Sequence, residues 1–582
     1  MKKTRRRFFR DAAIVGVGLA TGNLSSTASA VVRSDKWDRE ADVLVIGAGA
    51  TGLPAAIEAR ERGASVLLIE ANHEVGGHAI LSAGNIPLGG GNSLQKKYNV
   101  EDSPDLLFSD LTDWSVVEPN GFPDYRYNDK EIIRAFADNA AASFEWLIAH
   151  GVTFVDQAPD GGGGITVGRS VPRESHAAAL AWPLVQTGKP VKQSQQEHTS
   201  SGVGLIRPLE VAARKLNIPI LLEHKMTRLI RETPTSGRVI GITVESKGST
   251  FKIHARKAVI LATGGSTGNV NFRRIFDPRL TEEYNGSAGE PWSFQDASGE
   301  IAAMTIGASL WGAYNQVGEF GANLAKAGQI GTQYGYAVLQ WMPESSVFSR
   351  ARATGLRVLD WQDVILVNQA GRRFYDETAG RFGSASDWSY VPGSRPNDKV
   401  KYDPHNHDFF NAALAGTGLA KNGGGPIWAI FDADAVKREK WNPVPPYVDM
   451  ESGYFFMANS IMELASAIVM KHQPKGLPAQ SLQETVTRYN SFVDAGNDAD
   501  FGKPQPLYKI QTPPFYAAWA TPVIHDTRAG LRINAHSQVV DLKGEIIPGL
   551  YCGGESAGGF GMHGVARGIV QGRIAGMHAA SA

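Results

Sequence analysis

The stretch Ala41–Glu70, ADVLVIGAGATGLPAAIEARERGASVLLIE, decides the fold of this chain. It starts with a short apolar run of the kind that forms a buried parallel strand. The glycine-rich turn 47–52 follows at once, a helical pattern covers 53–62, and a second apolar run over 65–69 ends at Glu70. A strand, a GxGxxG turn, a helix and an acid about 20 residues later form the dinucleotide-binding fingerprint. The sequence therefore predicts an α/β fold that starts with a Rossmann-like domain.

Each glycine of this turn has its own physical role. Gly47 permits the tight turn, Gly49 lets the backbone approach a pyrophosphate, and Gly52 lets the helix pack closely on the strand. The helix that follows offers free N–H groups to the phosphates. Glu70 is expected to accept hydrogen bonds from a ribose. The fingerprint alone leaves both NAD and FAD open.

Composition excludes several classes of protein. A chain of 582 residues is too long for one compact core and suggests two or more domains. Its 58 basic and 58 acidic residues leave no chain-wide basic surface, so we expect no nucleic-acid partner. Cys552 is the sole cysteine, which excludes cysteine-rich zinc sites, iron–sulfur clusters and a CxxCH haem attachment, and we expect no metal site.

Residues 1–30 predict an export signal, with a disordered basic tail as the alternative. Six basic residues precede a mildly apolar stretch over 12–20, and Ala28-Ser29-Ala30 is a small-x-small cleavage site. The string TRRRFFR, residues 4–10, is similar to the twin-arginine motif, whose route carries folded proteins. No later apolar run reaches the roughly 18–20 residues of a membrane helix. We therefore expect a periplasmic mature protein without an integral membrane segment.

Three later motifs make the cofactor more specific. The loop EVGGHAILSAG covers 74–84, a strand-like run over 258–261 leads into Ala262–Gly265, and GLYCGGE over 549–555 precedes a helix over 566–580. Together with the fingerprint, they resemble the flavoprotein superfamily of succinate dehydrogenase and fumarate reductase, which includes urocanate reductases and 3-ketosteroid dehydrogenases. The resemblance covers nearly the whole chain after the signal, and it implies FAD as the cofactor.

The resemblance also implies where FAD is held. Glu70 would bind the adenosine ribose, Met226 in a strand over 220–230 would lie at the adenine, and Glu555 would bind the ribityl chain. The last helix would point its N-terminus at the flavin O2. The expected set is Gly47, Gly49, Ala50, Thr51, Gly52, Glu70, Ala71, Gly76, Gly77, His78, Ala83, Gly84, Met226, Ala262, Thr263, Gly264, Asp296, Glu555 and Val565.

Two of these positions have more than one interpretation. His78 falls where membrane-bound members carry the histidine that is covalently attached to FAD, and the alternative is a polar neighbour of the flavin without a bond. The segment Ser298–Ile301 resembles the family's acidic–glycine turn with acid and glycine displaced, so either Asp296 or Ser298 would take its role.

We expect the FAD-binding domain to consist of residues 38–312 and 523–582. The interval 313–522 would be an inserted α+β capping domain that closes over the flavin. A candidate proton donor lies in this cap, because a flavin moves hydride at one carbon while a protein group moves a proton at its neighbour. The string VNQAGRRFYDE, 367–377, is similar to a signature of the family's reductases, which implies Arg381 as the donor and Glu377 as its relay. A structural ion pair is the alternative.

The substrate positions depart from the fumarate pattern. In VIHDTRAG, 523–530, His525 is kept, but Asp526 stands where a substrate-binding histidine is expected, and the family's alanine–asparagine–arginine loop is missing. His563 is a further candidate that would face the flavin. Because a dicarboxylate needs paired cationic clamps, these losses argue against fumarate and succinate. Aromatic residues suit a ring-bearing substrate, although they could equally form core: Trp292, Trp311, Tyr314, Tyr334, Tyr336, Trp341 and Trp361.

The sequence thus predicts a FAD-dependent oxidoreductase that acts on a C–C bond next to a carbonyl or carboxylate. The rivals are a ketosteroid-dehydrogenase-like desaturase of cyclic ketones and a non-catalytic electron-transfer subunit. Because the chain has no haem or iron–sulfur motif, it must exchange electrons with O2 or with a separate carrier. A cytochrome or a quinone-linked protein is the carrier we expect.

Overall fold

The computed structural model describes residues 36–82, 84–112, 128–160, 170–180, 202–276, 280–283, 286–287, 292–312, 329–332, 355–378, 426–521, 523–524, 526–562 and 565–582. The expected export signal lies outside these residues. None of the helices in the described ranges combines the length and apolarity needed to cross a membrane.

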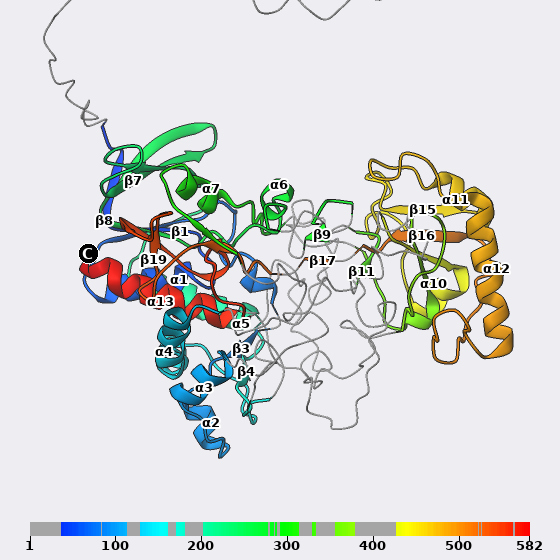
Figure 1. The fold of residues 1–582 in the computed structure, drawn as a ribbon, viewed down its shortest axis with the longest axis horizontal. Helices are drawn as coiled ribbons and strands as arrows, with labels where there is room; N and C mark the ends of the chain where they lie inside the picture. Colours follow the sequence, from blue (N-terminus) through cyan, green and yellow to red (C-terminus); the bar gives the residue numbers. More distant parts are fainter. Residues whose placement is uncertain are drawn as a thin grey trace, which may run out of the picture. The chain divides into compact units, whose positions relative to one another are not determined.

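An eight-stranded sheet forms the centre of the part of the chain that contains the fingerprint (Figure 1). Strand β1 (Arg39–Ile46) lies between β2 (Val66–Ile69) and β8 (Ser249–Leu261), and all three run parallel. Parallel strands β5 (Ile220–Leu221) and β20 (Ile546–Cys552) extend the sheet at β2 and β8. Antiparallel additions are β6 (Lys225–Arg231), β7 (Val239–Ser246) and β19 (Gln538–Val540). The predicted mixed α/β fold with a Rossmann-like parallel sheet is confirmed.

Helices α1 (Gly52–Glu61) and α13 (Val565–Ser581) pack directly against each other beside this sheet (Figure 1). Glycines recur every fourth residue on the contacting face of α13, at 568, 572 and 576. A methyl group at Gly572 would lie 2.2 Å from the Thr51 carbonyl oxygen, and one at Gly576 would lie 2.4 Å from that of Ala55. The two helices can therefore approach this closely only because these positions carry no side chain.

The remaining elements of this part surround the sheet. Helix α4 (Lys130–Ala149) contacts α13 and α3 (Pro104–Asp110), and Asp129 caps it by accepting a hydrogen bond from the Ile132 N–H. The other helices are α2 (Ser93–Lys97), α5 (Gly202–Lys215), α6 (Val270–Arg273) and α7 (Ser298–Met304), with the 3₁₀ turns η1 (Ala79–Leu81) and η6 (Gly554–Ser556). Short strands pair as β3 (Asn85–Pro87) with β4 (Glu174–His176), β9 (Gly286–Ser287) with β17 (Val523–Ile524), and β10 (Leu310–Trp311) with β18 (Gly530–Leu531).

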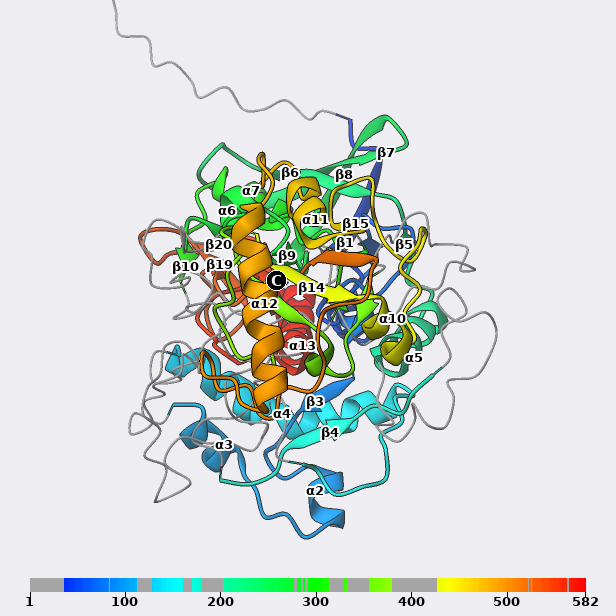
Figure 2. The same cartoon turned by 90° about the vertical axis from the view of Figure 1, so that its right-hand side faces the viewer.

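A second, antiparallel sheet has the order β13 (Ile365–Val367), β14 (Trp428–Asp432), β16 (Phe515–Trp519) and β15 (Phe455–Ala458). Its residues alternate between two separate apolar clusters, so that Trp428 and Ile430 face one cluster while Ala429 and Phe431 face the other. Helices α11 (Ile461–Ala467) and α12 (Ala479–Ala495) cover the first face (Figure 2). Helix α10 (Ala433–Glu439), the 3₁₀ turn η5 (Trp361–Asp363) and the pair β11 (Gln329–Ile330) with β12 (Leu356–Arg357) complete this part. These elements fall within 313–522, while the domain boundaries themselves stay a prediction.

One predicted element was wrong. The expected strand over 220–230 is two strands, β5 and β6, separated by a turn in which Glu223 has a left-handed φ of +57°. Strand β5 joins the parallel edge of the sheet, whereas β6 opens the antiparallel ribbon with β7. The turn thus redirects the chain from the parallel edge of the sheet to its antiparallel ribbon, and Met226 lies at the start of the second strand.

We expect Gly572→Ala to destabilise the protein by about 1–3 kcal/mol, because the added methyl group meets a backbone carbonyl that cannot move aside easily. Gly312→Ala is the matched control, since a methyl group there would meet nothing within 4 Å. Denaturant unfolding followed by circular dichroism measures both. Equal stability of the two variants would show that the helices tolerate a wider spacing.

Candidate functional site

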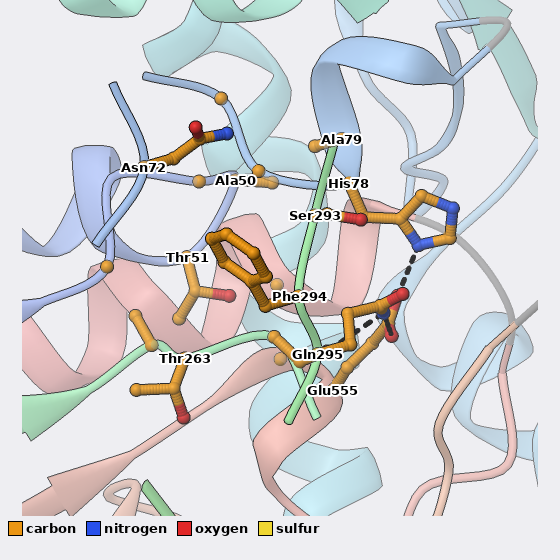
Figure 3. A pocket seen from close by; sticks show the side chains of 18 of the residues that line it. Ala50, Thr51, Asn72, His78, Ala79, Thr263, Ser293, Phe294, Gln295 and Glu555 are labelled. Atoms are coloured by element: carbon orange, nitrogen blue, oxygen red, sulfur yellow. Dashed lines mark hydrogen bonds and ion pairs between the residues drawn. The ribbon is translucent and has the colours of Figure 1, made fainter. Parts of the chain in front are cut away.

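A pocket lies at the carboxyl ends of the central parallel strands, where ligands bind in open α/β sheets. Its walls come from segments far apart in the sequence: the turn after β1, the end of β2, the loop before η1, the start of β6, the segment after β8 and the first turn of α13. Figure 3 shows several of these side chains around the same cavity.

Most of the predicted cofactor residues line this pocket. They are Gly47, Gly49, Ala50, Thr51, Glu70, Ala71, Gly76, Gly77, His78, Met226, Ala262, Thr263, Gly264, Asp296, Glu555 and Val565. Gly52 and Gly84 are not among the lining residues. Gly52 instead packs on the turn, where a methyl group would lie 1.7 Å from the Gly47 carbonyl oxygen. Ala83, Arg381, His525 and His563 lie outside the described residues, so their assigned roles stay predictions.

The glycine turn joins two strand ends at close range. Gly47 has a φ of +104°, and a methyl group on it would lie 2.2 Å from the Ala262 carbonyl oxygen at the end of β8. The Gly76 N–H donates to the Ala48 carbonyl at 2.9 Å, which draws the second glycine loop onto the first. Bare backbone therefore faces the pocket along one wall.

Glu70 is held against this turn by two backbone groups. One carboxylate oxygen accepts a hydrogen bond from the Ala48 N–H at 2.7 Å, and the other accepts one from the Asn72 N–H at 2.8 Å. Burial raises the pKa of Glu70, against the effect of these donors. The carboxylate keeps further lone pairs that can accept hydrogen bonds from the hydroxyls of a sugar.

Glu555 lies at the centre of a cluster of polar side chains on another wall of the pocket (Figure 3). Its Oε2 accepts hydrogen bonds from the Gln295 side chain at 2.7 Å and from the Thr527 N–H at 3.3 Å. Its Oε1 lies 3.7 Å from Nδ1 of His78. Gln295 also donates to the Gly264 carbonyl at 2.9 Å, although its φ of +41° is unusual for a side-chain-bearing residue. Gln295 thus links Glu555 to the segment after β8.

Both residues proposed for the displaced acidic turn line the pocket. Asp296 forms an ion pair with Lys225 at 2.6 Å and accepts a hydrogen bond from the Ser298 N–H at 3.0 Å. Burial tends to raise the pKa of Asp296, but Lys225 and Ser298 hold it below its ordinary value. The carboxylate is therefore charged and is held at the start of α7.

Arg567 brings a positive charge to the pocket from the first turn of α13. It is 2% exposed, and its guanidinium donates to the carbonyls of Phe560 at 2.7 Å and Thr527 at 2.8 Å. Burial lowers the pKa of Arg567 to about 10, so it stays protonated at neutral pH. Asp526, which also lines the pocket, is one of its charged neighbours.

Sequence reasoning missed several lining residues that belong to no motif: Asn72, Asn85, His224, Lys225, Ser293, Phe294 and Gln295. Their one signal is proximity in sequence, since they adjoin Ala71, Gly84, Met226 or Asp296. Of the aromatic residues considered for the substrate, Trp292 lines the pocket and Trp361 packs against the second sheet. Trp311 lies beneath Arg532, and the other four lie outside the described ranges.

Glu377 lies at the centre of a buried ionic cluster. Its two oxygens accept hydrogen bonds from Arg373 at 2.9 and 2.8 Å, Lys503 lies 3.3 Å away, and the Leu366 N–H donates at 3.1 Å. Arg373 also bonds Asp498 at 2.9 Å. Burial alone would raise the pKa of Glu377, but Arg373 and Lys503 hold it at about 2. This value lies below the ordinary 4.5, so the stability that the cluster contributes is present above about pH 4.5 and is lost as the pH falls toward 2.

These contacts give Glu377 a positioning role in the segment that leads toward Arg381. The relay role of Glu377 stays a prediction. Outside the pocket, Asp160, Glu174 and His176 hold potential metal-ligand atoms within 4.8 Å of one another, but His176 pairs with Asp160 at 2.7 Å. That arrangement is sufficiently explained by an ion pair.

Comparison with known proteins agrees with a nucleotide pocket of this kind. A family model described as "FAD binding domain" matches residues 42–569. The chain is 27% identical to a fumarate reductase (cytochrome) of Shewanella frigidimarina, over 95% of this chain and 81% of that protein. It is 27% identical to a urocanate reductase of Eggerthella lenta, over 93% and 75% of the two chains. It is 26% identical to a vinyl phenol reductase of Lactiplantibacillus plantarum, over 89% and 90%.

Solved structures share the fold. The open conformation of a flavocytochrome c3 fumarate reductase superposes with a TM-score of 0.59 and 25% identity, over 94% of this chain and 79% of that one. A 3-ketosteroid delta1-dehydrogenase from Sterolibacterium denitrificans gives a TM-score of 0.60 at 20% identity, over 93% and 100%. The second likeness concerns the fold alone. The pocket residues fit FAD, since bare glycine backbone, a buried acid at the end of β2 and a helix start meet in one cavity.

We expect Arg373→Met to destabilise the part of the protein around β13 and α12 by about 3–5 kcal/mol, because it leaves Glu377 and Asp498 buried without their main cation. The matched control is the adjacent Arg372→Met, which removes only a surface pair with Glu484 at 3.0 Å and is expected to cost about 1 kcal/mol or less. Denaturant unfolding followed by tryptophan fluorescence compares the two. A similar loss in both variants would contradict the role of the buried cluster.

Proposed function

We propose, from the premise that the chain belongs to the FAD binding domain family, that it is a reductase of C=C bonds next to a carboxylate. The substrate is an unsaturated acid that carries a ring, such as an aryl acrylate. One observation carries this proposal: the fingerprint turn, Glu70, Glu555 and Arg567 all line the same pocket. The fumarate and urocanate reductases among its relatives support the reaction class.

Bound FAD supplies the hydride for such a reduction. Glu70 and the glycine turn hold the nucleotide half, and Gln295, Glu555 and the first turn of α13 orient the other half. Arg567, a protonated side chain that lines the pocket, would favour negative charge on a cofactor held there. Arg381 then donates a proton to the carbon next to the one that receives the hydride.

The buried cluster around Glu377 supports this role of Arg381. Arg373, Lys503 and the Leu366 N–H all hold the Glu377 carboxylate, only four residues before Arg381. These charged contacts hold Glu377 in a fixed position, from which it could act on a neighbouring proton donor.

Asp526 supports a monocarboxylate rather than a dicarboxylate substrate. It is 3% exposed, lines the pocket and acts electrostatically on Arg567. A fixed carboxylate at this place repels the second carboxylate of fumarate, which instead requires a cationic partner. Two of the relatives are named for ring-bearing substrates, urocanate and vinyl phenol. The two names favour a ring on the substrate, and Asp526 favours a single carboxylate beside it.

Electrons reach the protein from a separate carrier of the cytochrome or quinone-linked type. The relative named fumarate reductase (cytochrome) is consistent with the first type. Residues 1–30 direct the folded protein to the periplasm by the twin-arginine route.

Export is tested by fractionating cells that produce the full chain. We expect replacement of Arg5 and Arg6 together by lysine to leave an uncleaved precursor in the cytoplasm, because twin-arginine recognition depends on the arginine pair. Lys3→Arg, which keeps the charge, is the control. An unchanged distribution of the double variant would contradict this route.

The reaction is tested by anaerobic stopped-flow absorbance against fumarate, urocanate, aryl acrylates, cyclic ketones and a 3-ketosteroid. We expect the dithionite-reduced protein to be reoxidised fastest by a ring-bearing unsaturated acid, and Arg381→Ala to slow that step about 100-fold or more with unchanged FAD content. Fast reoxidation by fumarate would contradict the substrate class. Bleaching of the oxidised protein by a saturated ketone would favour the desaturase, and no response to any compound would favour an electron-transfer subunit.

A further inference from the structure

Glu300 is a buried carboxyl group that is not among the residues assigned to FAD binding. It lies in the first turn of α7 and is 0% exposed. Within the part of the chain that the structure describes, neither of its oxygens accepts a hydrogen bond of good geometry. A buried acid without such bonds is costly to ionise, and natural cores seldom keep one without a reason.

One layer of side chains separates Glu300 from the nucleotide pocket. Its neighbour Gly299 packs on Thr263, because a methyl group there would lie 2.2 Å from Thr263 Oγ1. Thr263 lines the pocket (Figure 3). Its hydroxyl lies 2.9 Å from Ser556 Oγ. Ser556, in turn, is the polar side chain that acts on Glu300 and lowers its pKa, and it accepts from the Gly265 N–H at 3.2 Å. The order from core to cavity is Glu300, Ser556, Thr263.

Charges in the pocket already act on Glu300. Burial raises the pKa of Glu300 to about 8, Ser556 offsets part of that rise, and the carboxylates of Asp296 and Glu555 add to it. Both of these carboxylates line the pocket, and Asp296 is itself paired with Lys225. Cys552 is another buried neighbour whose thiol pKa is raised by burial and by Glu300, and the pocket residue Arg567 acts on that thiol in the opposite direction. A further negative charge inside the pocket therefore acts on Glu300 in the same direction.

We propose that Glu300 takes up a proton when the FAD bound in this pocket is reduced. Reduction by two electrons and one proton leaves an additional negative charge on the flavin. An ionised Glu300 then binds a second proton from solvent and becomes a neutral carboxylic acid, so the overall uptake is two protons for two electrons. The electrons come from an external reductant, dithionite in the test below. This inference requires FAD but no particular substrate, so its failure leaves the proposed reaction unaffected.

The coupling has a defined pH window. Below about pH 8, Glu300 is already protonated before reduction and takes up nothing. Above that value it is ionised in the oxidised protein and is protonated on reduction. Each proton that is bound together with two electrons changes the equilibrium constant of reduction tenfold per pH unit. This corresponds to a change of about 30 mV in the reduction potential. The potential of the wild-type protein should therefore fall twice as steeply with pH above this value as below it.

The test is a potentiometric titration of the purified holoprotein with dithionite and mediators, over about two pH units on either side of this point. We expect the potential of the wild type to fall more steeply with pH above this point than below it. In Glu300→Gln, whose side chain cannot titrate, this steeper limb of the curve should be lost. Glu545→Gln, which removes an exposed carboxylate, is the control and should keep both limbs. Glu300→Leu serves as a second neutral variant should the glutamine impair folding. A steeper limb that persists in the neutral variants, or is absent from the wild type, would overturn the proposal.

A stability measurement separates this role from simple packing. The folded-state pKa of Glu300 lies above its ordinary value of 4.5, so ionisation opposes folding as the pH rises from 4.5 to about 8. We expect the folding constant of Glu300→Gln relative to wild type to rise with pH over this range, by up to tenfold per unit. A stability change without any change in the redox slope would assign Glu300 a structural role alone and contradict the proposal.

Discussion

Four glycines surround Thr51, and the nucleotide pocket depends on that close packing. Methyl groups at Gly554 and Gly568 would lie 2.2 and 2.8 Å from the Thr51 hydroxyl, and one at Gly572 would lie 2.2 Å from its carbonyl oxygen. Gly553 approaches its methyl group from the end of β20. Because Thr51 starts α1, these contacts place the last helix of the chain on the first, and the pocket wall at Glu555 opposite the wall at Glu70.

Local motifs made the first half of this site predictable. The patterns are contiguous, and the spacing of their residues alone predicts their chemistry: the turn 47–52, the acid at 70 and the loop 76–84. Gln295 is different, because its importance comes from reaching Glu555, which is 260 residues away. No local pattern contains that contact. The break between β5 and β6 was missed for a related reason, since a left-handed Glu223 leaves no glycine or asparagine as a signal.

The second sheet shows the same limit on what sequence patterns can reveal. Its alternating strands follow from the two-residue period, and the signature over 367–377 identifies one edge of the charged cluster. The partners Asp498 and Lys503 come from the loop after α12, more than a hundred residues later. A charged group in that loop is indistinguishable in sequence from the many solvated ones. Only the folded chain shows that these two are buried and hold Arg373 and Glu377 in place.

The contact between α1 and α13 has a consequence for the order of events during synthesis. The two helices are separated by about 500 residues, so a ribosome working at roughly 5–20 residues per second finishes the second about 25 to 100 seconds after the first. Throughout that interval the fingerprint turn is present while the wall that contains Glu555 and Arg567 is not. The cofactor can therefore be enclosed only after α13 has been made, and loss of this helix would leave the pocket without one of its walls.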